Sequence, residues 1–191
     1  GVSTMRVEEK LDAGRVFMRR SCEILPRETA GELHLRLAAI GAELLVETLA
    51  RLEAGALRPE PQDEALATHA SKLKKADGLI PWEKSASAVD AHVRAMTPWP
   101  GAFSRLHDRT VHVLRGAPCV AAPDGGAEPG KILGLDGDAL IIGCGAGAFR
   151  RFGAIARIRI AFGEFARPEF GGDALRDLFA RLFAHLLLLH D

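Results

Sequence analysis

The 191-residue sequence has no tyrosine, only three cysteines, no long apolar run and no net charge. Cys22, Cys119 and Cys144 lie far apart and form no C-x-x-C pair. This spacing argues against a disulfide framework or a zinc site and favours a reducing compartment. No apolar run approaches the roughly 20 residues of a membrane span, and no signal-peptide pattern is present. We therefore expect a cytoplasmic globular protein with no metal and no membrane partner.

The charges are unevenly distributed along the chain. Residues 1–67 carry 9 basic and 12 acidic side chains, which leaves 16 basic and 13 acidic side chains for residues 68–191. Any surface that binds a polyanion therefore belongs to the second part. Aromatic residues make up only 6% of the sequence, so few side chains are available to stack on nucleic-acid bases.

The first distinctive stretch is Leu11-Asp12-Ala13-Gly14. Apolar patterns predict strands at residues 2–7 and 15–22, so Asp12 falls in a loop between two strands. A loop carboxylate beside a glycine is a common place for chemistry. It is also an ordinary turn residue, because Asp satisfies its own loop backbone. Spacing alone leaves both interpretations open.

A helix follows, from a capping box at Thr29 and Glu32 to Gly55. Gly41 is expected to kink or split it. Beyond it, residues 58–64 read as an extended polar linker. The lysines Lys72, Lys74 and Lys75 then form either a solvated face or a phosphate contact. A short helix capped at Ser85 or Ser87 completes the linker, which residues 97–101 end abruptly.

From residue 102 to residue 160 the sequence predicts short strands. They are expected at residues 102–106, 110–115, 131–135, 138–143 and 148–160, with a Pro/Gly-rich loop at 116–130 and a hairpin turn at 143–147. Five strands in this length suit a small OB-like β-barrel. Four arginines fall on its late strands: Arg150, Arg151, Arg157 and Arg159. They form either a nucleic-acid-binding face or the polar outside of a half-buried sheet.

The last segment, residues 171–191, predicts an amphipathic helix. The fold class expected is α/β followed by all-β. Residues 1–56 form the end of one domain, 57–101 a linker with a short helix, 102–170 the barrel and 171–191 the tail helix. Self-association is expected through the tail helix or through an exposed sheet edge.

Several motifs in this order resemble the methionyl-tRNA formyltransferase family. They are Gly1-Val2-Ser3-Thr4-Met5, Leu11-Asp12-Ala13-Gly14, Thr29-Ala30-Gly31-Glu32-Leu33, Gln62-Asp63-Glu64, Lys72-Leu73, Trp82 and Pro98-Trp99-Pro100-Gly101-Ala102-Phe103. The resemblance implies the end of a Rossmann-like formyltransferase domain, then a linker and an OB-like barrel. It also implies transfer of a formyl group from 10-formyltetrahydrofolate to the amino group of methionyl initiator tRNA.

The resemblance also implies the roles of particular residues. Asp12 matches the family's catalytic Asp, which orients and charge-stabilises a catalytic His. The folate pocket is implied at Val7, Glu8, Glu9 and Leu11. The lysines around Leu73 match a basic linker near the tRNA.

The chain departs from the family in several places. The family's amino-terminal half has no match, and neither do its catalytic Asn and His. Gly1 fits a chain that starts inside a longer one. His69 and Pro81 stand where the family usually has Tyr and Asp, Ala13 stands in place of Thr, and residues 151–191 do not match the family's ending. We expect this polypeptide alone to be inactive. The alternatives are a non-catalytic tRNA-binding module, a sugar-nucleotide formyltransferase and a remnant without function.

Overall fold

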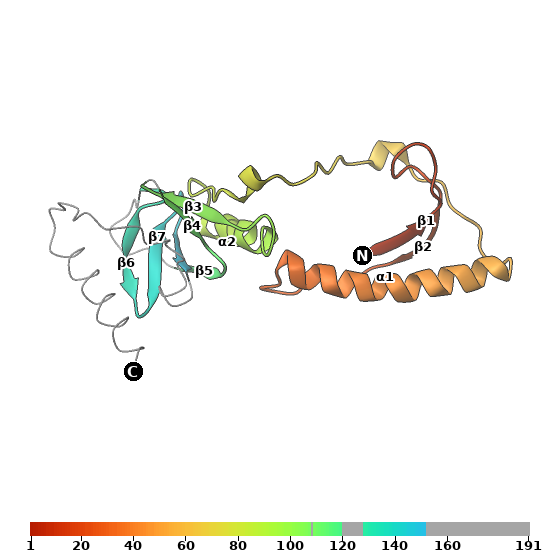
Figure 1. The fold of residues 1–191 in the computed structure, drawn as a ribbon, viewed down its shortest axis with the longest axis horizontal. Coiled ribbons are helices and arrows are strands. Elements are labelled where there is room, and N and C mark those ends of the chain that lie inside the picture. The colour runs from red at the N-terminus through yellow and green to blue at the C-terminus, as the bar shows by residue number, and fades with distance from the viewer. Residues whose placement is uncertain (108, 120–127, 152–191) are drawn as a thin grey trace. The chain divides into compact units, whose positions relative to one another are not determined.

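The computed structural model of the chain describes residues 1–107, 109–119 and 128–151. Its contacts divide the chain into two compact units (Figure 1). The first unit comprises residues 1–78 and 94–100, and the second comprises residues 79–93 and those from 101 onward. The tail expected as a helix, residues 171–191, lies outside the described residues.

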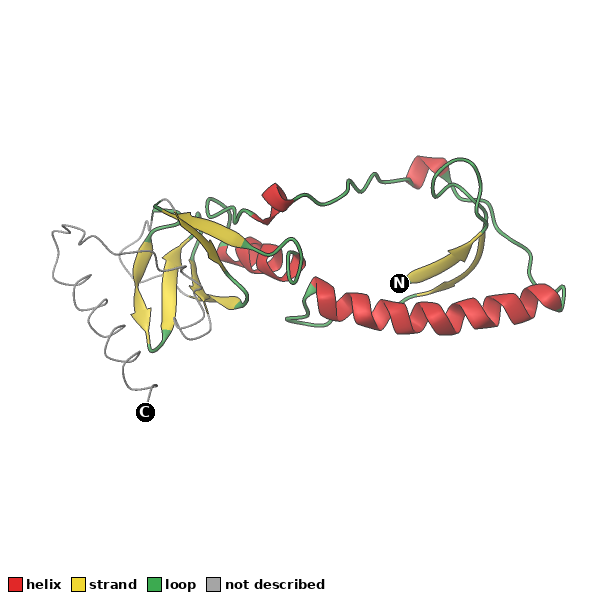
Figure 2. Ribbon diagram, in the orientation of Figure 1, coloured by secondary structure: helices red, strands yellow, loops and turns green. Residues whose placement is uncertain are grey.

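The first unit is a β-hairpin packed along one long helix (Figure 2). Strands β1 (Val2–Met5) and β2 (Val16–Arg20) pair antiparallel, and helix α1 (Ala30–Glu53) lies against them. The helix buries Leu44 and Thr48 in this contact. The Thr48 hydroxyl donates to the Leu44 carbonyl (2.6 Å) and lies 2.9 Å from the Thr4 hydroxyl of β1. A buried polar pair is therefore satisfied between strand and helix.

Helix α1 begins as the sequence predicted but is not interrupted. Thr29 and Glu32 form the capping box, and Gly55 has a φ of 66° just beyond the helix. The helix runs continuously through Gly41, so the alternative of a split there was wrong. A Cβ at Gly41 would lie 3.4 Å from Val2 Cγ1. Packing of the hairpin against this glycine outweighs its low helix propensity.

Glu28 fixes the chain at the start of α1. Its Oε1 accepts from Arg36 Nη1 (2.6 Å), and its Oε2 accepts from the backbone N–H of Leu25 (3.0 Å). The hydrogen bond from Arg36 is the main reason that the pKa of the Glu28 carboxyl lies below its ordinary value of 4.5. Both bonds favour the ionised form, so protonation weakens this end of the helix.

Glu28 gives the first unit a stability that depends on pH. Because the pKa is lower in the folded state, the contribution is complete above the ordinary value of 4.5 and is lost as pH falls through the folded value. Urea midpoints measured from neutral pH down to about pH 3 should fall less steeply in Glu28→Gln than in the wild type. An equal fall in both proteins would contradict this assignment.

The described part of the second unit contains a helix and two antiparallel sheets. Helix α2 (Ala86–Ala95), of which residues up to Val93 belong to this unit, is capped by Ser85, whose Oγ accepts from the N–H of Ala88 (3.3 Å). One sheet pairs β3 (Phe103–Leu106) with β4 (Arg109–His112). The other has the order β5-β8-β7-β6. Its strands are β5 (Gly116–Cys119), β6 (Ile132–Asp136), β7 (Ala139–Gly143) and β8 (Ala148–Arg151).

The prediction that residues 116–119 belong to a loop was wrong. They form β5, which pairs antiparallel with β8. Pro118 obscured this strand, because proline cannot donate to a central ladder but is tolerated at a sheet edge. A Cβ at Gly116 would lie 2.1 Å from the Phe149 ring, so the glycine is required by packing. The turn expected between β7 and β8 is confirmed by their antiparallel pairing.

The core of the second unit is built around Phe149. This side chain is fully buried, as are Val89 and Val93 of α2. The Trp82 ring meets Phe149 edge to face at a centroid distance of 6.0 Å. Trp82 Nε1 donates to Ser104 Oγ (2.9 Å), so the indole is buried with its polar atom satisfied. Within the described residues, no helix is both long and apolar enough to cross a membrane.

Candidate functional site

The candidate site is the loop that joins β1 to β2, residues 6–15, which we call the Asp12 loop. The Arg6 N–H donates to the Arg15 carbonyl (2.9 Å) and closes the base of the loop. At its tip, the Ala13 N–H donates to the Lys10 carbonyl (3.4 Å). Asp12 lies within this turn with a φ of 53°. Asp adopts this left-handed region more readily than most residues, which suits it to the position.

Gly14 is required by the closure of the Asp12 loop. It is buried, and a Cβ on it would lie only 1.8 Å from the Arg6 carbonyl oxygen. The backbone on the two sides of the loop therefore approaches too closely for any side chain at this position. The glycine beside Asp12 thus fixes the shape of the loop.

The Asp12 carboxylate is available for chemistry. Asp12 is exposed, and its side chain has no hydrogen-bond or ion-pair partner among the described residues. A carboxylate held in a defined turn and left open to solvent can accept a hydrogen bond from a substrate or from a side chain of another segment. The expected role as a turn residue therefore does not occupy this side chain.

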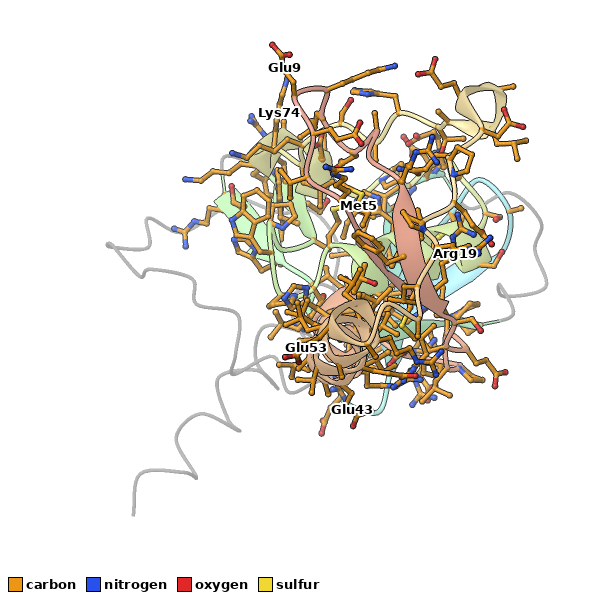
Figure 3. The ribbon with its side chains drawn as sticks, turned by 90° about the vertical axis from the view of Figure 1, so that its right-hand side faces the viewer. Met5, Glu9, Arg19, Glu43, Glu53 and Lys74 are labelled. Atoms are coloured by element: carbon orange, nitrogen blue, oxygen red, sulfur yellow. The ribbon has the colours of Figure 1, made fainter. Side chains whose placement is uncertain are left out.

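The four residues expected at the folate pocket all lie on the Asp12 loop and are all exposed. Two of them are large and apolar: Val7 is 90% exposed and Leu11 is 87% exposed. Glu9 points away from the ribbon (Figure 3), and Glu8 is exposed as well. Val7 and Leu11 therefore present apolar surface to solvent on a loop that is otherwise largely polar.

The segment after α1, residues 58–64, was predicted to be a surface linker, and it also contacts the Asp12 loop and the start of β2. Glu60 and Val16 exchange two backbone hydrogen bonds of 2.8 Å. Gln62 Nε2 donates to the carbonyls of Asp12 (2.8 Å) and Gly14 (2.7 Å). The hydrophobic periodicity of the sequence gives no signal for contacts between this segment and the Asp12 loop. The position of Gln62 in the ordered motif set was the only hint.

An ion pair adds to this contact at the surface. Lys10 Nζ lies 2.6 Å from Glu64 Oε1, and this hydrogen bond is the main reason that the pKa of Glu64 lies below its ordinary value. Both side chains are largely exposed, so we expect the pair to contribute little to stability.

The basic residues expected to contact nucleic acid divide between the two units. Lys72, Lys74 and Lys75 are exposed in the first unit, at and before the short 3₁₀ turn Lys75–Gly78. In the second unit, Arg150 Nη1 lies 3.1 Å from Asp136 Oδ2. Arg151 is only 4% exposed, and burial lowers the pKa of its guanidinium. Arg157 and Arg159 lie outside the described residues.

Comparison with known proteins matches both parts of the chain to one family. A model described as "Formyl transferase" matches residues 1–49, and one described as "Formyl transferase, C-terminal domain" matches residues 72–159. A methionyl-tRNA formyltransferase of Citrifermentans bemidjiense is 45% identical over 148 residues, which are 78% of this chain and 45% of the relative. One of Solibacter usitatus is 45% identical over 171 residues, which are 88% of this chain and 54% of the relative.

The chain spans about half the length of the curated relatives that it matches. Among solved structures, HypX from Aquifex aeolicus in complex with tetrahydrofolic acid is similar in fold, with a TM-score of 0.57 and 24% identity. That similarity covers 77% of this chain and 25% of HypX.

Proposed function

The chain belongs to the formyl transferase family, and we propose that it carries part of the site at which a formyl group passes from 10-formyltetrahydrofolate to methionyl initiator tRNA. The observation that supports this most directly is the Asp12 loop, which holds an unpartnered carboxylate in a chain 45% identical to methionyl-tRNA formyltransferases. The formyl donor is a substrate, and no metal takes part in the proposal.

The proposed role of Asp12 is to orient a proton-carrying imidazole. In the reaction, the α-amino nitrogen of methionine forms a bond to the formyl carbon, and the bond from that carbon to N10 of the folate breaks. One proton leaves the attacking amine and one reaches N10. An imidazole that moves these protons gains positive charge, which an adjacent carboxylate stabilises. The imidazole would come from the His that the family resemblance implies.

The exposed face of the Asp12 loop is the proposed contact for the folate. Val7 and Leu11 offer apolar surface to a ring system, and binding would remove both side chains from water. Glu8 and Glu9 provide acceptors for ring N–H groups. HypX, a structural neighbour, is described in complex with tetrahydrofolic acid, which is consistent with a folate-type donor in proteins of this fold.

The proposed tRNA contacts are the lysines of the first unit and the sheets of the second. We propose that these sheets form an OB-like barrel, supported by the four-stranded sheet and the β3–β4 hairpin. Lys72, Lys74 and Lys75 are exposed and can follow a phosphate backbone. Arg150 and Arg151 suit this role less well, because Arg150 is paired with Asp136 and Arg151 is buried.

Replacing the three lysines together with glutamine should weaken tRNA binding in a salt-dependent way. Each phosphate contact contributes about 0.7–0.9 to the slope of log K against log salt, so the magnitude of the slope should fall by about 2. Arg51→Gln serves as the control, because this exposed cation of α1 is paired with Glu47 and lies outside the proposed tRNA contacts. A slope unchanged by the triple substitution would remove these lysines from the tRNA site.

A competition between acceptors tests the proposed function. The active enzyme that carries these residues is given 10-formyltetrahydrofolate, methionyl initiator tRNA and a sugar nucleotide with a free amine. Formylation of the methionyl-tRNA supports the proposal. Formylation of the aminosugar alone would favour the rival formyltransferase activity, and tRNA binding without turnover would favour a binding module.

Three further expectations accompany this proposal. The 191 residues alone should not catalyse formyl transfer, because no His of the sequence matches the catalytic His that the family resemblance implies. A translation enzyme of this kind acts in the cytoplasm. Self-association through the tail helix or an exposed sheet edge stays a prediction.

A further inference from the structure

Gln62 connects the Asp12 loop to the segment that follows α1. Its side-chain nitrogen donates to the carbonyls of Asp12 and Gly14, at 2.8 and 2.7 Å. We propose that Gln62 is a positioning residue for formyl transfer, which holds the backbone on both sides of Ala13 so that the Asp12 carboxylate keeps its direction. This inference rests on the proposed function.

The chemistry of the site specifies a side-chain amide at this position. Carbonyl oxygens only accept hydrogen bonds, so the group between them must donate twice. The NH₂ of Gln62 has two donors and places one on each carbonyl. A Glu in this place would set a carboxylate against two carbonyl oxygens, and an Asn would be one methylene too short.

Gln62 is itself fixed from both sides. Glu60 forms a two-bond bridge with Val16, the first residue of β2. Asp63 caps the short 3₁₀ turn Glu64–Leu66, because its Oδ1 accepts from the N–H of Ala65 (2.9 Å). The side chain of Gln62 therefore extends from a backbone with two anchors, although the residue lies at the surface.

The hydrogen bond from Gln62 to the Asp12 carbonyl restrains the backbone of Asp12. The direction of the Asp12 carbonyl sets its ψ, and its φ of 53° lies in the left-handed region, which Asp tolerates but which is sparsely populated by residues other than glycine. The neighbouring Lys10–Glu64 ion pair supplies less support, because its side chains are 70% and 78% exposed. Without the amide we expect the turn to sample other conformations and the carboxylate to move.

Kinetics of the active enzyme that carries these residues test the proposal. Gln62→Met keeps the length of the side chain but removes both donors. It should lower kcat by about tenfold to a hundredfold, with the KM for methionyl-tRNA changed by less than about threefold. Glu64→Gln breaks the neighbouring ion pair and should leave kcat within about twofold of the wild type.

A double substitution separates positioning from general destabilisation. If Gln62 acts through Asp12, then Gln62→Met should cost less than about twofold when Asp12 is already Asn. An equal loss in both backgrounds, or a loss confined to KM, would overturn the proposal.

Hydrogen exchange on the 191-residue chain supplies a readout that does not need activity. The amides of Arg6 and Ala13, which close the Asp12 loop, should exchange at least about tenfold faster in Gln62→Met and unchanged in Glu64→Gln. Unchanged exchange in Gln62→Met would overturn the proposal. A wild-type enzyme that does not formylate methionyl-tRNA would instead overturn the proposed function, and exchange would still decide whether Gln62 holds the loop.

Discussion

Asp12→Asn should lower the kcat of formyl transfer by about a thousandfold or more in the active enzyme that carries these residues. The amide has the shape of the carboxylate but no charge, so it cannot stabilise an imidazole that becomes positive in the transition state. Asn also tolerates the left-handed φ of 53°, so the loop should keep its conformation. The loss should therefore appear in kcat, with little change in urea stability.

The matched control for this substitution is Asp63→Asn. It makes the same chemical change close by in the first unit, at a residue that caps a 3₁₀ turn. Asn caps about as well as Asp, so activity and stability should both stay close to those of the wild type. If Asp12→Asn retained more than about a tenth of the activity, Asp12 would not be the residue that stabilises the imidazole.

Phe149→Ala should destabilise the second unit by about 3–5 kcal/mol. The side chain is fully buried, and truncation leaves a cavity lined by Trp82 and the surface of Gly116. Trp82 is buried beside the substituted ring, so its fluorescence reports unfolding of this unit. The measurement is made in a Trp99→Phe background, because Trp99 belongs to the first unit.

Two controls accompany the Phe149→Ala measurement. Leu114→Ala removes a side chain that is 53% exposed and should shift the urea midpoint little. The unfolding of α1, followed by hydrogen exchange of its amides, should be unchanged in Phe149→Ala. A shift of similar size in both units would show that they unfold together, which would contradict their description as separate compact units.

Short-range sequence patterns predicted most of the secondary structure of the described residues. The capping box at Thr29 and the glycine after α1 are short-range signals, and both are confirmed. The split considered at Gly41 was wrong, since α1 continues through this residue and packs against β1. Strand β5 was missed for a similar reason, since its pairing with β8 joins distant residues and Pro118 conceals it.

The candidate site was predictable only in part. The sequence placed Asp12 in a loop between two strands, which the structure confirms. It did not show that residues 60–64 return to this loop, because a side-chain amide that bonds two backbone carbonyls leaves no periodic signal. The sequence also did not reveal that Arg151 is buried, because alternation of charge along a strand does not indicate which face of the sheet is buried.

The most direct test of the central claim is hydrogen exchange at residues 7–14 in the active enzyme, with and without a stable analogue of 10-formyltetrahydrofolate. If the Asp12 loop lines the formyl-transfer site, saturating analogue should slow exchange there by about tenfold or more. The exposed turn between β6 and β7, around Gly137, serves as the internal reference and should not change. Full binding of the analogue with no protection at residues 7–14 would contradict the account.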